Sequence, residues 1–180
     1  MNRVILTPPE LPSAALAELK QWLGVTTTAD DAPLLSLLTA ALDVCEGFTG
    51  QMPLEAECEE VLPATAGWHR LATRPVQAIT SAELIATDGT RTALDAVTYA
   101  IDLQAGGTGR IRLPGGETRV AVRFTAGLTA DWDALPKALR HGLIRLAAHQ
   151  HRERESAGAA PLPPASVAAL WRPWRRVRLT

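Results

Sequence analysis

The period of the hydrophobic positions changes twice along the chain. In the first part, apolar residues recur at helical spacing over residues 14–23, between Ser13 as a candidate N-cap and Gly24 as a candidate stop. A second helical pattern covers residues 32–48, after a polar turn. The first third of the chain is therefore predicted to form two short amphipathic helices.

The middle of the chain, residues 56–127, shows strand and turn signals instead. Asp88 and Gly89 stand between two apolar stretches, which is a strong hairpin signal. Residues 97–101 predict a short strand, and residues 118–125 alternate between apolar and polar positions as in a half-buried antiparallel strand. The pattern indicates a small antiparallel β-domain.

The helical period returns after Pro136 and continues to about residue 153. A proline-rich linker follows at residues 156–164, before a final stretch that is rich in tryptophan and arginine. The expected fold class is α+β: a helical bundle built from the N- and C-terminal segments, an inserted small antiparallel β-domain, and a C-terminal docking arm.

This organisation predicts four parts with defined boundaries. They are an N-terminal helical segment (residues 1–55), the inserted antiparallel β-domain (56–131), a long helix that packs on the N-terminal helices (132–157), and the proline-rich linker with the Trp/Arg docking arm (158–180).

The composition is that of a globular chain. At 180 residues and 47% hydrophobic, the chain is long and apolar enough to bury a core without metal or disulfide staples. Its two cysteines are expected to be reduced packing residues in a cytosolic protein. The N-terminus does not have the pattern of a signal peptide and no apolar run approaches 18 residues, so no membrane is expected as a partner.

The formal net charge of −1 conceals a strong asymmetry. Residues 1–60 carry 2 basic and 10 acidic side chains, whereas residues 137–180 carry 9 basic and 2 acidic ones. Such a distribution indicates interaction with a charged partner or between copies of the chain.

Motifs for catalysis or cofactor binding are weak in this sequence. The glycine-rich residues 106–109 lack the Lys-Ser/Thr of a phosphate loop and precede a strand, so a hairpin loop is favoured. His149 and His151 would point about 200° apart on a helix, which disfavours a shared metal site. Neither cysteine has an activating neighbour in the sequence. We therefore expect no enzyme activity, no metal and no cofactor.

The C-terminal Trp-Arg cluster is the best candidate for an interaction site. Trp171 and Trp174 are three residues apart and flanked by arginines, a combination that protein interfaces concentrate. Two alternatives stay open here. The tryptophans can fold back onto the core, or the tail can bind nucleic acid through its charge.

The ordered set of motifs resembles the head–tail connector, or adaptor, proteins of tailed bacteriophages and gene transfer agents. The matching segments are Thr7–Pro9 before a helix that begins Ser13–Leu16, Asp30–Leu35 leading to Glu46–Gln51, Arg74–Ile79 before the Asp88–Gly89 hairpin, Val122–Gly127, and Leu135–Leu139 at the start of the last long helix. The Trp/Arg-rich end departs from the family pattern in being longer and more basic.

The resemblance implies a structural role at the head–tail junction of a phage or gene transfer agent particle that is assembled in the bacterial cytoplasm. Such proteins form a ring, generally of twelve copies, between the portal protein and the stopper or tail connector. The ring extends the channel through which DNA passes without sequence-specific binding. The residues expected to dock on the portal are Leu170, Trp171, Arg172, Trp174, Arg175, Arg176 and Arg178.

Two further sets of residues follow from the charge pattern and the ring hypothesis. Candidates for contacts between neighbouring subunits are Asp30, Asp31, Glu59, Glu60, Arg140 and Arg145. Candidates for facing the DNA channel or a partner are Arg110, Arg112, Arg119 and Arg123. The alternative function is a DNA-binding or DNA-packaging accessory protein that uses its basic C-terminus.

Overall fold

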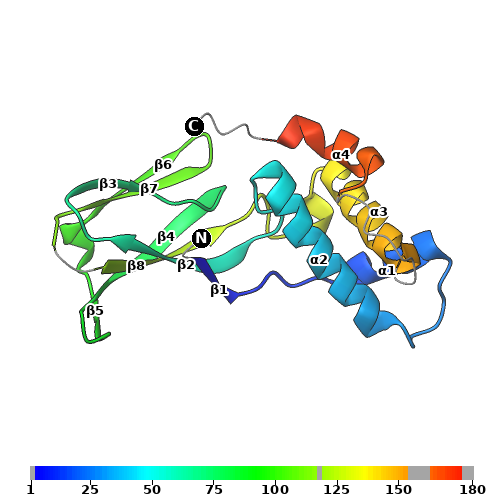
Figure 1. The fold of residues 1–180 in the computed structure, drawn as a ribbon, viewed down its shortest axis with the longest axis horizontal. Coiled ribbons are helices and arrows are strands. Elements are labelled where there is room, and N and C mark those ends of the chain that lie inside the picture. Colours follow the sequence, from blue (N-terminus) through cyan, green and yellow to red (C-terminus); the bar gives the residue numbers. More distant parts are fainter. Residues whose placement is uncertain (1–2, 117–118, 154–162, 176–180) are drawn as a thin grey trace. The chain divides into compact units, whose positions relative to one another are not determined.

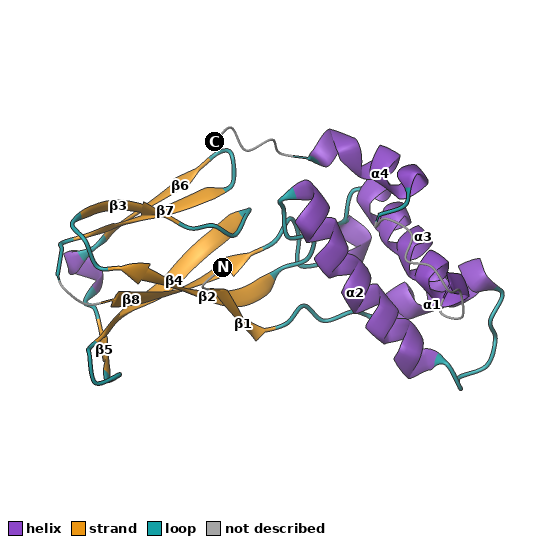
Figure 2. Ribbon diagram, viewed as in Figure 1, coloured by secondary structure: helices purple, strands orange, loops and turns teal. Residues whose placement is uncertain are grey.

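The computed structural model describes residues 3–116, 119–153 and 163–175 (Figure 1). These residues form four α-helices and two antiparallel sheets (Figure 2), so the predicted α+β class is confirmed. The chain divides into two compact units. The sheet unit comprises Met1–Pro9 and Glu55–Gly127, and the helical unit comprises Glu10–Leu54 and Leu128–Thr180.

The sheet unit contains eight strands and one 3-10 turn in its described residues. These are β1 (Arg3–Thr7), β2 (Ala56–Pro63), β3 (Gly67–Arg70), β4 (Val76–Ile85), β5 (Arg91–Ala93), η1 (Ala96–Thr98), β6 (Ala100–Gln104), β7 (Thr108–Leu113) and β8 (Arg119–Ala126). The strand order is β1-β2-β8-β4-β5 in the larger sheet and β3-β7-β6 in the smaller.

β8 is the central strand of the larger sheet and supplies much of the core. Its Phe124 is opposite Cys58 of β2 and Ile79 of β4, and both Phe124 and Cys58 are fully buried. The smaller sheet packs on β4 through β7. Gly109 of β7 lies so close to Val76 that a Cβ atom would come within 2.9 Å of that side chain, which explains a glycine inside a strand.

Two expectations for this unit need correction. Residues 3–7 were expected in the N-terminal helical segment, but they form β1 and pair with β2, since the β-branched residues Val4, Ile5 and Thr7 favour a strand. A strand was expected over residues 97–101, but Asp95 accepts a hydrogen bond from the Val97 amide and starts the turn η1, so β6 begins only at Ala100.

The helical unit contains α1 (Ser13–Leu23), α2 (Asp31–Thr49), η2 (Trp132–Ala134), α3 (Lys137–Glu153), α4 (Ala165–Trp171) and η3 (Arg172–Trp174). Side chains from all four α-helices share one buried cluster, which includes Leu19, Leu38, Leu143 and Trp171. A long helix was expected over residues 132–157. The first of these residues form the separate 3-10 turn η2, and α3 is described from Lys137 to Glu153.

The helix ends agree largely with the sequence signals. Gly24 and Gly50 adopt the left-handed conformation after α1 and α2, and the Gly50 amide donates to the Glu46 carbonyl. Ser13 is the first helical residue instead of the expected N-cap, because Pro12 occupies that position without a side-chain cap.

α2 is long and apolar enough to cross a membrane by length and composition alone. Core helices of soluble proteins pass the same test. In α2 the residues Leu34, Leu38, Ala41 and Cys45 are buried in the shared cluster of the helical unit. This recurrence at three- and four-residue spacing is the pattern of a helix that packs one face on a protein core.

Candidate interaction surfaces

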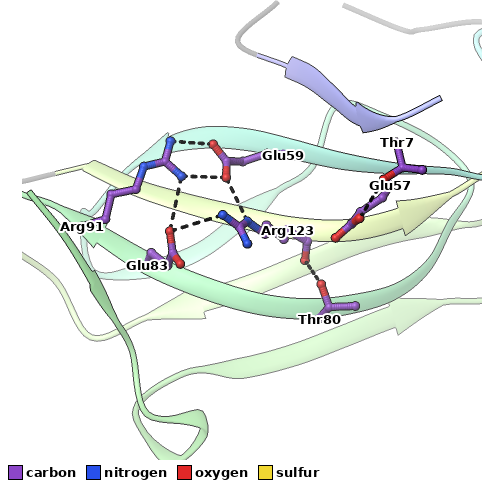
Figure 3. Close-up of polar contacts among 7 residues, drawn as sticks. All are labelled: Thr7, Glu57, Glu59, Thr80, Glu83, Arg91 and Arg123. Atoms are coloured by element: carbon purple, nitrogen blue, oxygen red, sulfur yellow. Dashed lines mark hydrogen bonds and ion pairs between the residues drawn. The ribbon is translucent and has the colours of Figure 1, made fainter. Parts of the chain in front are cut away.

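A network of two carboxylates and two guanidinium groups crosses one face of the larger sheet (Figure 3). Arg91 forms a bidentate pair with Glu59, with both N···O distances at 2.8 Å, and Arg123 Nε donates to Glu59 Oε2 at 3.2 Å. Glu83 lies 3.3 Å from Arg91 Nη1 and 3.9 Å from Arg123 Nη2. The network thereby connects four strands, β2, β8, β4 and β5, through charged side chains.

The electrostatics of this network favour the ionised carboxylate. Hydrogen bonds from Arg91 hold the pKa of Glu59 below its ordinary value against the opposing effect of burial, and Arg123 adds to the lowering. Glu59 in turn raises the pKa of Arg91. Bidentate arginine–carboxylate geometry is directional, so the pair restrains Arg91, and with it β5, relative to Glu59 of β2.

The Glu60 carboxylate is hydrogen-bonded to the loop that follows β3. It accepts hydrogen bonds from the backbone amides of Ala72 and Thr73, each at 2.9 Å, and from the Thr73 hydroxyl at 2.7 Å. Glu59 and Glu60 are 5% and 4% exposed. Both carboxylates, which were predicted to contact neighbouring subunits, therefore have their hydrogen-bond partners within the chain.

Two of the four predicted subunit-contact residues of the helical unit, Asp31 and Arg140, have ion-pair partners inside it. Lys20 Nζ donates to Asp31 at 2.6 Å, next to Asp30 at the start of α2. Arg140 pairs with Glu18 at 2.9 Å and with Asp133 at 2.7 Å. Because the helical unit combines the acidic N-terminal and basic C-terminal segments, the charge asymmetry along the sequence is partly neutralised in the fold.

Arg145 lies at a small pocket of about 180 Å³. The other lining residues are Trp22, His149, Arg152, Pro164, Ser166 and Val167. The pocket is basic, and His149 pairs with Glu153 at 2.9 Å on the same helix. Its location on the helical unit brings the predicted contact residue Arg145 next to the exposed indole of Trp22.

The four arginines predicted to face a channel or partner do not form one surface. Arg123 belongs to the carboxylate network, and Arg119 is an exposed residue at the start of β8. Arg110 and Arg112 are two residues apart on β7 and so point to the same side of the smaller sheet.

The smaller sheet adds two residues to that side which the sequence analysis did not single out. Trp68 is opposite Arg112 and Arg70 is opposite Arg110, so all four share one face. The Arg110 guanidinium carbon lies 4.7 Å from the centre of the Trp68 ring, and Asp102 is 3.5 Å from Arg110 Nε. The alternation of residues 68–70 is a weak strand signal in the sequence. The pairing of β3 with β7 was needed to place Trp68 and Arg70 on the same face as Arg110 and Arg112.

The described part of the predicted docking arm lies on its own helical unit. Trp171, which was expected as an exposed anchor, is fully buried, and its Nε1 donates to the Leu139 carbonyl at 3.3 Å. Its ring is tilted against Phe48 with centroids 6.2 Å apart. Of the two possibilities open for the tryptophans, folding back onto the core is the one observed for Trp171.

The residues around Trp171 are more accessible. Leu170 and Trp174 are partly buried against the core, and Gln51 Nε2 donates to the Trp174 carbonyl at 2.6 Å. Arg172 is exposed, and Arg175 places its guanidinium carbon 5.5 Å from the centre of the Phe48 ring. Arg176 and Arg178, also predicted to dock, lie outside the described residues.

Metal and thiol chemistry have little support in the described residues. No group of three or more histidine, cysteine or acidic side chains gathers there in a way that could hold a metal ion. Cys45 and Cys58 are both buried, and burial raises the pKa of Cys45 to about 12. A thiol of such high pKa is a poor nucleophile near neutral pH.

No known family profile and no curated protein matches this chain. Solved structures do match. A chain in the structure described as "Neck of empty GTA particle computed with C6 symmetry" is 30% identical with a TM-score of 0.79, and the match covers 100% of this chain and 98% of that one. The chain belongs to the head–tail connector, or adaptor, family of phages and gene transfer agents.

Two further structures agree with this membership. The connector-family chain is 30% identical to a chain in "Virion of native gene transfer agent (GTA) particle", with a TM-score of 0.76 and coverage of 100% and 98%. It is 31% identical to one in "Neck of native GTA particle computed with C12 symmetry", with a TM-score of 0.74 and coverage of 98% and 97%. The likeness includes both units of this connector-family chain, because the alignments span almost all of it.

Proposed function

We propose that this chain is a structural component of the neck of a tailed phage or gene transfer agent particle. Its specific role is that of an adaptor that forms a ring, of twelve copies, between the portal and the stopper or tail. The observation that carries the proposal is the full-length match to chains in gene transfer agent neck structures at 30–31% identity. The C6 and C12 symmetries of those structures support a closed ring of identical subunits.

The internal polar networks support a structural role. In the described residues the networks at Glu59 and at Glu60 join strands and loops of the same chain. Bidentate and charge-assisted hydrogen bonds are directional, so these networks hold the subunit in one shape.

The fold narrows the residues proposed for docking on the portal. Trp171 is a core residue, so the accessible part of the described segment is Arg172, Trp174 and Arg175. Arg176 and Arg178, which follow in the sequence, stay in the proposal as residues outside the described part. Removal of residues 165–180 would take the buried Val167 and Trp171 from the core. A test of docking therefore has to leave α4 in place.

The set of arginines proposed to line the DNA channel also becomes smaller. Arg123 pairs with Glu59 and Glu83, and Arg110 pairs with Asp102, so Arg112 and Arg119 are the stronger candidates to line the DNA path. These residues would contact phosphates without reading bases. If the alternative DNA-binding function applied, the purified chain would bind duplex DNA tightly, with a steep dependence on salt.

The decisive experiment is deletion of the gene for this chain, followed by electron microscopy of the particles and complementation. Wild-type complementation should restore tailed particles with this chain in a ring at the neck. A variant that lacks residues 176–180 and carries Arg172→Glu should form rings that do not attach to heads, whereas the matched surface variant Arg152→Glu should behave as wild type. Normal tailed particles without the chain would overturn the proposal.

A further inference from the structure

The described residues of the sheet unit have two apolar sheet edges. β1 is the terminal strand of the larger sheet and β6 is the terminal strand of the smaller one. Of the eight large hydrophobic side chains that are exposed in the described chain, six lie on β1 or in the η1–β6 segment. They are Val4 (57%), Ile5 (36%), Leu6 (41%), Val97 (87%), Ile101 (43%) and Leu103 (45%).

The other two edges of the sheets are protected in the ways that natural proteins use. β5 has only three residues and carries Arg91, which is held by the carboxylate network. β3 has four residues, among them a histidine and an arginine. Short strands and charged side chains discourage pairing with another chain.

β1 and β6 lack this protection. Each has five residues, neither contains proline or lysine, and each carries one charged residue, Arg3 on β1 and Asp102 on β6. Among the described strands, β1 pairs only with β2 and β6 pairs only with β7, so each has one side that is not part of a sheet. An apolar strand edge of this kind is a template for an added strand.

We propose that β1 of one copy pairs with β6 of the next copy, so that each subunit contributes two different edges to a head-to-tail contact. Two structural observations point to a second copy as the occupant: the two edges have equal lengths and both expose apolar side chains. The C6 and C12 symmetries of the similar neck structures agree with a contact between identical chains. A contact between two different surfaces repeats from copy to copy and closes into a ring when the rotation allows. The inference rests on the proposed ring and names the surfaces that build it.

The pairing would join sheets of neighbouring subunits into a continuous layer. Ile101 and Leu103 are opposite Ile111 and Gly109 of β7, so they extend the inner face of the smaller sheet to its edge. Ile5 is opposite the buried Cys58 of β2 and does the same for the larger sheet. Pairing would cover these side chains and place β1 and β6 between two strands each.

The test uses single lysine substitutions in the full-length chain, with native mass spectrometry as the readout. Ile5→Lys and Leu103→Lys should each reduce the mass from that of the ring to that of one chain, 19.2 kDa. Thr92→Lys, on the protected edge β5, adds the same charge to an exposed strand and should leave the ring intact. Thermal unfolding checks that each variant is folded, and Val4→Lys replaces Ile5→Lys if that variant is not.

Mixing the two disrupted variants tests the head-to-tail pairing directly. The Ile5→Lys copy retains a functional β6 and the Leu103→Lys copy retains a functional β1, so an equimolar mixture should form dimers and no rings. Cysteines placed at residues 5 and 103 in separate copies should also form a disulfide-linked dimer, since the natural cysteines are buried.

The outcomes separate the edge contact from the proposed function. Wild-type rings together with intact rings of both lysine variants would overturn the edge contact and leave the ring standing. Dimers of Leu103→Lys alone would overturn the head-to-tail arrangement in favour of β1 with β1. A wild-type chain that stays monomeric and absent from necks would overturn both the edge contact and the proposed function.

Discussion

The indole of Trp171 lies directly over the backbone of Gly142, so closely that a Cβ atom at residue 142 would overlap the ring. Both residues are fully buried or nearly so, one on α4 and the other on α3. The contact between Trp171 and Gly142 thus packs the short helix α4 closely against the long helix α3. This contact explains why the tryptophan is a core residue instead of an exposed anchor.

We expect Gly142→Ala to destabilise the protein by about 1–3 kcal/mol, because the new methyl group displaces Trp171. Trp171→Ala should cost about 3–5 kcal/mol through lost burial. The control is Gly47→Ala, at a helical glycine of α2 whose added Cβ meets nothing within 4 Å. That variant should gain up to about 1 kcal/mol in helix propensity. Denaturant unfolding measures all three, and equal effects of the two glycine substitutions would contradict the packing argument.

Replacing Glu59 with glutamine should lower the free energy of unfolding by about 2 kcal/mol, since Arg91 and Arg123 lose their charged partner. Glu57→Gln is the matched control, because its partner is the exposed Thr7 hydroxyl (Figure 3). Chemical denaturation at neutral pH compares the two variants. A loss for Glu57→Gln as large as that for Glu59→Gln would remove the special role of the network.

The same carboxylate gives a pH dependence of defined sign. The folded-state pKa of Glu59 lies below its ordinary value of 4.5, so its contribution to stability is complete above that value and is lost as the pH falls through the folded pKa. The difference in stability between wild type and Glu59→Gln should therefore be constant near neutral pH and should shrink under acid conditions. A difference that grows on acidification would contradict the assigned direction.

Glu60 should control the order of the loop that follows β3. In Glu60→Ala the amides of Ala72 and Thr73 lose their acceptor, and we expect hydrogen exchange at these two amides to accelerate at least tenfold. Glu60→Gln retains one carbonyl acceptor and should give a smaller effect. Unchanged exchange in Glu60→Ala would show that the loop is held by other contacts.

The thiol of Cys45 should be inert in the folded chain. Burial raises its pKa to about 12, so the thiolate is scarce at pH 8 and the sulfur is inaccessible to reagents. Labelling with a thiol reagent should proceed only after denaturation. Rapid labelling of Cys45 in the native protein would mean that α2 opens readily.

Several local elements were predictable because their causes lie within a few residues. The apolar spacing of α1 and α2 and their glycine stops, Gly24 and Gly50, depend on near neighbours, and both helices form close to the expected bounds. The Asp88–Gly89 turn between β4 and β5 is similar: the Asp88 carboxylate accepts from the Thr90 amide at 2.8 Å. The connector resemblance was also visible in the sequence, as an ordered set of such local segments.

The candidate surfaces were less predictable because they depend on residues far apart in the chain. Glu59 and Arg123 are 64 residues apart, and their pairing follows from the register of β2 with β8. No pattern near Glu59 indicates that it is buried, and none near Arg3–Thr7 indicates which strand it joins.

The sequence by itself thus determined the α+β class, the main helices and the family, since these follow from periodicity, local turn chemistry and the order of motifs. The tertiary structure decided which charged and aromatic residues are available to partners. Trp171 is a core residue, and the apolar edges of β1 and β6 are exposed. Glu59 accepts hydrogen bonds from arginines of the same chain, and Glu60 accepts them from backbone amides. The physical reason is that burial and pairing are properties of the whole packed chain, which a local pattern does not contain.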